Sequence, residues 1–254
     1  MAFTEANDDK SYQSILDNAV KFLKAEQWDE SKGIDTSDPR FGGTGYGEKS
    51  RPDLSNTSFM LDALKAAGLP QSDPAYQRAI VFIRRCQNQS GEGANDLPVG
   101  KEINDGGFFY TPVGDPMGTT TEGGLRSYGS MTYAGLKSFL YAGVQPDDFR
   151  VQAAYQWIQK HYTLQENPGQ GDAGLFYYYH TFAKALAALD VEVVVDDKAV
   201  RHSWREDLVK TLLSKQNPDG SWINTNRRWM ETDPQLVTAF ALMSLGQATR
   251  PSEK

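Results

Sequence analysis

Apolar residues recur with the three- and four-residue spacing of an amphipathic helix in eight separate stretches of the chain. These stretches cover residues 15–23, 59–67, 76–86, 131–140, 151–158, 182–189, 208–213 and 236–245. Pro74, Pro146 and Pro234 lie near predicted helix starts, and Gly68 and Gly143 follow predicted ends. The β-branched stretch 191–195 is brief, so it predicts a loop or a two-stranded ornament. The pattern therefore predicts an all-α fold.

The predicted helices fall into two kinds that alternate along the chain. Four of them contain small and apolar residues on every side and can be aligned on Thr57, Thr132, Thr181 and Thr238, which lie roughly 50–75 residues apart. The other four carry more Lys, Arg, Glu and Gln. A helix that is apolar all round is buried, so we expect the threonine-aligned helices to be inner and the others outer.

A short sequence pattern precedes each predicted inner helix. It consists of a glutamine, a glycine-containing turn and an aromatic residue, because glycine permits the turn and the ring can pack against the neighbouring hairpin. The four examples are Gln27 with Gly43-Thr-Gly-Tyr46, Gln87 with Gly106-Gly-Phe108, Gln165 with Gly174-Leu-Phe176, and Gln216-Asn-Pro-Asp-Gly-Ser-Trp222. We expect the glutamine side chain to bond backbone groups left unpaired at the end of an outer helix.

These repeats resemble those of squalene-hopene cyclases and protein prenyltransferases, the prenyltransferase/squalene-oxidase repeat family. The resemblance covers about residues 12–246, and its most similar segments are Gly124-Leu-Arg-Ser-Tyr-Gly-Ser-Met-Thr-Tyr-Ala-Gly-Leu136 and Tyr177-Tyr-Tyr-His-Thr-Phe-Ala-Lys-Ala-Leu186. It implies an (α/α) toroid or partial toroid of about four helical hairpins around a central cavity. We expect residues 1–254 to form that single repeat domain.

The residues that perform the family's chemistry are not retained. The best match to the D-x-D-D acid motif of the cyclases is Asp53-Leu-Ser55-Asn56, in which only the first acid remains. Tyr128-Gly-Ser130 occupies the place of the D-G-C zinc ligands of the prenyltransferases, which leaves His180 without partners. The Cys-Gly-Glu-Gln of related thioester domains does not occur. We therefore expect no metal site and no cofactor.

Composition excludes further classes of protein. The formal net charge is -7, which argues against nucleic acid as a partner because phosphate binding needs a basic surface. No apolar stretch is long enough to span a membrane, and the first ten residues lack an apolar signal region. Cys86 is the single cysteine, so no intrachain disulfide can form. We expect a soluble protein, either cytoplasmic or exported with its signal removed, for which an oligomer remains possible.

The candidate site lies at the starts of the inner helices. If all inner helices run in the same direction, their first turns form a ring at one end of the cavity, where Asp53, Arg126, Tyr128, Tyr179, His180 and Glu231 should converge. The candidate catalytic residues are Asp53, Tyr179, His180 and Glu231, and the candidate ligand-binding residues are Asn56, Arg126, Tyr128, Ser130, Tyr178 and Trp229. The alternative is a hydrogen-bonded network that only joins the repeats.

Three functions are compatible with these residues. The first is a squalene-cyclase/prenyltransferase-like repeat protein, atypical or non-catalytic, that binds an apolar or isoprenoid-like ligand in its cavity. The second is a terpenoid cyclase-like enzyme with an unusual acid, such as Asp53 or Glu231, and aromatic walls that stabilise a carbocation. The third is a polysaccharide lyase or hydrolase that uses Tyr, His and Arg on an oligosaccharide.

Overall fold

All eight helices expected from the apolar pattern are present. The structure, a computed structural model, describes residues 2–47, 50–114 and 125–250. The eight are α2 (Gln13–Glu26), α3 (Leu54–Ala66), α4 (Pro74–Arg85), α6 (Gly129–Tyr141), α7 (Phe149–Lys160), α8 (Leu175–Ala188), α9 (Trp204–Ser214) and α10 (Pro234–Thr249). Shorter elements are α1 (Ala2–Glu5), α5 (Val99–Glu102), η1 (Glu30–Lys32) and η2 (Arg228–Met230). The all-α prediction is confirmed.

Local signals in the sequence fix several helix boundaries. Asp73, Asp148 and Asp233 are the N-caps of α4, α7 and α10, and each carboxylate accepts a bond from the backbone N–H two residues further on. Pro74 and Pro234 are the first residues of their helices, where no N–H is needed. Gly68 and Gly143 follow the C-caps of α3 and α6 with φ angles of 76° and 92°. These positive angles terminate the helices as expected.

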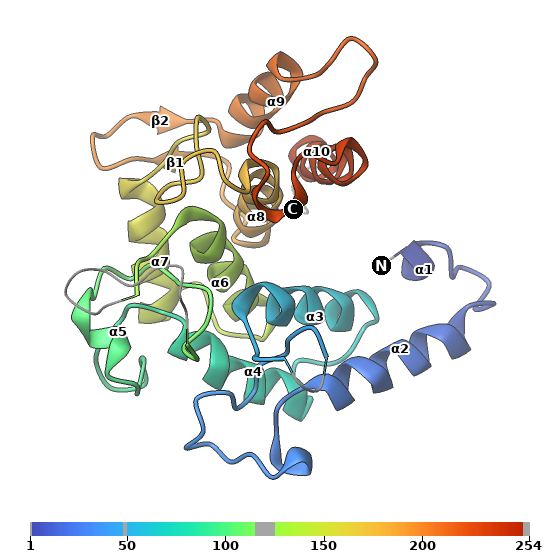
Figure 1. The fold of residues 1–254 in the computed structure, drawn as a ribbon, viewed down its shortest axis with the longest axis vertical. Helices are drawn as coiled ribbons and strands as arrows, with labels where there is room; N and C mark the ends of the chain where they lie inside the picture. Colours follow the sequence, from blue (N-terminus) through green and yellow to red (C-terminus); the bar gives the residue numbers. More distant parts are fainter. Residues whose placement is uncertain (1, 48–49, 115–124, 251–254) are drawn as a thin grey trace.

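The four threonine-aligned helices form a continuous series, the inner series. In Figure 1, α3, α6, α8 and α10 follow one another through the molecule, and each contacts the next. The more polar helices lie along this series, since α2 packs on α3, α4 on α3 and α6, α7 on α6, and α9 on α8 and α10. Helices α6 and α8 are buried over most of their length, whereas α2 contributes no fully buried residue. Helix α10 departs from the expected burial of the threonine-aligned helices, because only Val237, Ala241, Ser244 and Ala248 of it are buried.

The stretch 191–195 contributes one strand of a small hairpin. Strand β1 (Val194–Val195) pairs antiparallel with β2 (Arg201–His202), and Val194 lies opposite His202. Because each strand has two residues, the pair contributes little to the core. These are the only strands in the described part of the chain, and the two-stranded alternative is the one observed.

Threonine side chains connect three of the inner-series helices to the turns that precede them. The hydroxyl oxygens of Thr57, Thr132 and Thr238 accept bonds from the backbone N–H groups of Thr44, Phe108 and Trp222, at 3.0, 3.0 and 3.1 Å. Thr181 differs, because its hydroxyl donates to the Tyr178 carbonyl of its own helix at 3.0 Å. Each of the first three threonines therefore pairs a turn N–H group that would otherwise be buried against the helix without a hydrogen-bond partner.

Two of the glutamines make matching bonds. The Gln27 side chain donates to the carbonyls of Gly42 and Ala75 at 2.9 and 3.0 Å. Gln87 donates in the same way to Gly106 and Arg150, at 2.9 and 2.8 Å. The first acceptor of each pair is a glycine with positive φ, and the second is residue two of the next outer helix. Each glutamine side chain thus joins its turn to the start of the following outer helix, and neither acceptor lies at the end of the helix before it, where the bonds were expected.

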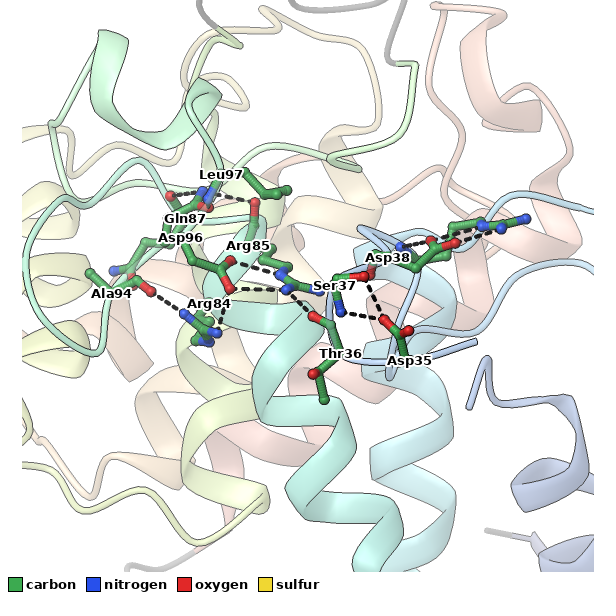
Figure 2. Close-up of polar contacts among 12 residues, drawn as sticks. Asp35, Thr36, Ser37, Asp38, Arg84, Arg85, Gln87, Ala94, Asp96 and Leu97 are labelled. Atoms are coloured by element: carbon green, nitrogen blue, oxygen red, sulfur yellow. Dashed lines mark hydrogen bonds and ion pairs between the residues drawn. The ribbon is translucent and has the colours of Figure 1, made fainter. Parts of the chain in front are cut away.

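A polar network at the end of α4 fixes the long loops beside it (Figure 2). The Arg85 guanidinium, 2 % exposed, makes two bonds to the Asp96 carboxylate at 2.7 and 2.9 Å. It also donates to the carbonyls of Asp38 and Thr36, at 2.8 and 2.5 Å. Arg84 donates to the same Asp96 carboxylate, and both arginines lower the pKa of that carboxyl. These contacts hold the loop between α2 and α3, and the loop that follows α4, against the end of α4.

None of the helices within the described residues combines the length and apolar character needed to cross a membrane.

Candidate functional site

A cavity with a volume of about 440 Å³ lies along the inner series of helices. Volumes of this order are typical of small-molecule sites. The cavity is bounded mostly by aromatic and apolar side chains. Its lining consists of Tyr46, Arg51, Ser55, Phe59, Tyr110, Tyr128, Ser130, Met131, Tyr177, Trp229, Leu236 and Phe240.

Two helices at opposite ends of the inner series supply much of the wall. Ser55 and Phe59 come from α3, and Leu236 and Phe240 from α10. Both pairs have the spacing of four residues that brings side chains onto one face of a helix. Tyr177 at the start of α8 lies between them, with its ring centre 6.2 Å from that of Phe59 and 5.7 Å from that of Phe240. The rings of Phe59, Tyr177 and Phe240 therefore form one continuous surface, the aromatic wall of the cavity.

Trp229 enters the lining from a strained turn. Its φ of 55° places it in the left-handed region, which is unfavourable for a bulky side chain. Its ring lies against Gly174, where an added Cβ would be 2.6 Å from the indole. Gly174 has a φ of 65° and is the N-cap of α8. Glycine is thus required here both by the backbone and by the close approach of the tryptophan.

Comparisons with protein-family profiles, with curated proteins and with solved structures found no match for this chain.

Asp53 is buried beside the cavity and caps α3. It is 2 % exposed, and its carboxylate accepts bonds from the backbone and side-chain N–H groups of Asn56, both at 2.7 Å. Burial raises the pKa of this carboxyl above its usual range, although hydrogen bonds from Asn56 and Tyr110 lower it. Because Tyr110 lines the cavity and Asp53 does not, this carboxyl lies behind the wall. The bond from the Asn56 backbone N–H is the one that a helix-capping carboxylate makes.

Glu231 caps a helix from another part of the chain. It is 1 % exposed and accepts bonds from the Tyr177 backbone N–H at 2.8 Å and from the Asn224 side chain at 2.7 Å. Burial raises the pKa of this carboxyl, against the effect of hydrogen bonds from Asn224 and from the first backbone groups of α8. Asn167 does the same for α6, since its side-chain oxygen accepts from the Ser130 N–H at 2.9 Å. Each loop thus supplies the missing cap of the inner helix before it.

Tyr178 and Tyr179 point away from the cavity. Both are fully buried, and their hydroxyls donate to the carbonyls of Thr163 and Leu164, each at 2.7 Å. Burial raises the pKa of both phenols well above their usual range. Of the three consecutive tyrosines only Tyr177 lines the cavity, where its hydroxyl lies 2.9 Å from the Ser55 hydroxyl. The other two act as packing residues with a satisfied hydroxyl.

His180 lies behind the aromatic wall. It is 2 % exposed and is held between the rings of Phe59 and Phe240, with centre-to-centre distances of 6.1 and 5.6 Å. Within the described residues neither ring nitrogen has a hydrogen-bond partner. Burial lowers the pKa of the imidazole to about 3, helped by the nearby positive charges of Lys137 and Lys184. The ring is therefore neutral at physiological pH.

The buried imidazole makes stability depend on pH. Since its pKa is about 3 in the folded protein and near 6.5 when exposed, its contribution is complete above pH 6.5 and is lost as the pH falls. We expect the wild type to lose about 2 kcal/mol more than His180→Phe between pH 7 and pH 5. Urea unfolding of both proteins at the two pH values measures this difference. Parallel losses would mean that His180 is protonated without cost in the folded state.

A buried ion triad lies further along the same helices. The Asp62 carboxylate, with no exposed side-chain area, bonds Lys137 and Lys184 at 2.5 Å each. The two ammonium groups lower the pKa of Asp62 below its usual range, against the effect of burial. Burial in turn lowers the pKa of Lys137. The triad joins α3, α6 and α8 through one carboxylate.

A second hollow of about 360 Å³ lies between α2 and α3 and shares Tyr46 and Phe59 with the first cavity. Asn56 lines this hollow and not the larger cavity. Arg126 is exposed and lines neither of them. No group of three or more His, Cys, Asp or Glu residues that could hold a metal ion occurs in the described ranges.

Of the ten candidate residues, the larger cavity thus brings together Tyr128, Ser130 and Trp229. Asp53 and Glu231 cap helices, Tyr178, Tyr179 and His180 are packed, and Asn56 and Arg126 lie elsewhere. Four of the missed residues could have been found from helical spacing, because Ser55 and Phe59, and likewise Leu236 and Phe240, are four residues apart on predicted inner helices. Arg51 and Tyr110 come from loops and carried no such signal, and Tyr46 was expected only as the aromatic residue of a repeat turn.

Proposed function

We propose that this chain is a repeat protein similar to the squalene cyclases and prenyltransferases that binds an apolar or isoprenoid-like ligand in its larger cavity. One observation carries the proposal. Among the twelve described residues that line this cavity, Arg51 alone bears a formal charge, and nine of the others are aromatic or apolar side chains, four of them tyrosines. Apolar walls with a few polar groups are typical of small-molecule sites.

The arrangement of helices supports a partial (α/α) toroid of four hairpins. The inner series α3, α6, α8 and α10 is continuous, and the four more polar helices lie along it. A repeated hairpin unit is favoured by two sets of matching hydrogen bonds. Gln27 and Gln87 donate equivalent bonds, and the hydroxyl oxygens of Thr57 and Thr132 accept equivalent bonds. In a toroid of this kind, the larger cavity is the central cavity that the inner helices surround.

The geometry favours binding over acid catalysis. A cyclase acid must present a protonated carboxyl to the substrate. Asp53 lies behind Tyr110, and Glu231 receives backbone N–H groups at the start of α8, so both carboxyls are used as helix caps. The geometry does not favour a polysaccharide lyase or hydrolase either, because the hydroxyls of Tyr178 and Tyr179 donate to backbone carbonyls and point away from the cavity.

Binding of the uncharged fluorescent probe N-phenyl-1-naphthylamine tests this function. We expect one saturable site in the wild type and at least roughly tenfold weaker binding in Leu236→Trp, because the larger ring fills part of the cavity. Leu242→Trp is the matched control, since Leu242 lies on the same helix but is 57 % exposed. Absence of saturable binding to the wild type, or equal loss in both variants, would refute the proposal.

A further inference from the structure

The larger cavity contains one positive charge in a fixed position. Both hydrogen bonds that Arg51 makes within the described residues use Nη1, which donates to the carbonyl oxygens of Val113 and Gly114. These bonds orient the planar guanidinium from one corner. Nη2 and Nε carry further N–H groups on one edge of the guanidinium, and this edge can donate two parallel hydrogen bonds to a carboxylate.

No acidic group is bonded to the Arg51 guanidinium within the described residues. Arg51 makes no ion pair there, and none of the cavity-lining residues is acidic. Asp53 is the carboxylate whose charge interacts with Arg51, but it is bonded by Asn56 and Tyr110 and lies behind the wall. A half-buried guanidinium beside apolar surface gains most from an anion that arrives with an apolar body.

We propose that the ligand of this cavity is an apolar molecule with a single carboxylate, which pairs with Arg51 while its apolar part lies against Phe59, Tyr177 and Phe240. This inference rests on the proposed binding function and specifies its ligand class. A carboxylate fits because one guanidinium balances one negative charge. A diphosphate would leave most of its charge unpaired, since the described lining offers neither a second cation nor a cluster of metal ligands.

The aromatic wall and Arg51 have separable roles. The wall binds the apolar part of any ligand through burial of its surface, whatever the head group is. Arg51 distinguishes ligands of equal length by their charge, because only an anion forms a charge-assisted pair of hydrogen bonds with the guanidinium. Specificity for a carboxylate should therefore disappear without Arg51, while affinity for uncharged ligands persists.

Competition against N-phenyl-1-naphthylamine tests this division, with dodecanoate, 1-dodecanol and dodecyl phosphate as competitors of equal chain length. We expect dodecanoate to displace the probe from the wild type at concentrations roughly tenfold to a hundredfold lower than 1-dodecanol. In Arg51→Gln the two should become equivalent through loss of dodecanoate affinity alone. Arg126→Gln, at an exposed arginine outside the cavity, should behave as the wild type.

The outcomes separate the two proposals. If the wild type does not bind the probe, the binding function itself fails. If it binds the probe but dodecanoate and 1-dodecanol compete equally, or dodecyl phosphate competes better than dodecanoate, the function stands and the carboxylate inference is overturned. The wild-type comparison decides this even if Arg51→Gln does not fold. Arg51→Lys provides a second variant, which should keep part of the preference because the charge remains and the two-bond geometry is lost.

Discussion

Replacing Asp62 with asparagine should destabilise the protein by about 3–5 kcal/mol, as is usual when one partner of a buried ion pair is removed. Asparagine has nearly the same shape, so packing is retained. The ammonium groups of Lys137 and Lys184, both now 2.5 Å from the carboxylate, would be left without their counter-charge in a buried site. Urea unfolding at pH 7 measures the difference in the free energy of unfolding.

A triple variant controls for the charge itself. Asp62→Leu combined with Lys137→Met and Lys184→Met replaces the whole triad by apolar side chains, and such replacements are often neutral or stabilising. We therefore expect the triple variant to be at least as stable as the wild type and clearly more stable than Asp62→Asn. A loss of less than about 1 kcal/mol in Asp62→Asn would show that the lysines leave the core or lose their protons at little cost.

Trp222→Ala should cost roughly 3–5 kcal/mol, the range for deletion of a large buried aromatic side chain. Trp222 is 2 % exposed and belongs to the core, and its indole N–H donates to the Leu212 carbonyl of α9 at 2.8 Å. Its backbone N–H donates to Thr238 of α10. The residue therefore joins the last turn to both helices of the final hairpin, and thermal unfolding should detect its loss.

Trp222→Phe separates packing from hydrogen bonding. It keeps most of the buried ring and loses only the bond to Leu212, which is worth about 1 kcal/mol with a further cost for the unpaired carbonyl. We expect Trp222→Phe to unfold at a temperature between those of the wild type and Trp222→Ala. A melting temperature for Trp222→Ala within error of the wild-type value would contradict the buried position of the ring.

The helices could be predicted because their signals are local. Apolar spacing, proline near the start and glycine after the end act within a few residues, and Gly68 and Gly143 end their helices as expected. The threonine alignment also has a physical basis, because three of the four hydroxyls accept a turn N–H. Thr181 departs from this pattern, and α8 receives its cap from Glu231 instead.

The site was harder to predict because its parts lie far apart in the sequence. Polar residues at helix starts were expected to converge on a ligand, but a carboxylate there can equally cap a helix, as Asp53 and Glu231 do. Arg51 gave no signal, since it lies in a loop and reaches the cavity only through tertiary folding. Lys137 and Lys184 are 75 and 122 residues away from Asp62 in the sequence, so only the packing of three helices reveals the ion triad.

Anomalous diffraction from crystals grown with 1-bromononane tests most directly whether the larger cavity holds an apolar ligand. The bromine locates the molecule, and the absence of charge makes the result independent of Arg51. We predict an ordered bromine site within the cavity, next to Phe59, Tyr177 and Phe240. Bromine found only at exposed apolar side chains, such as those of Leu242 and Met243, would contradict the proposed function.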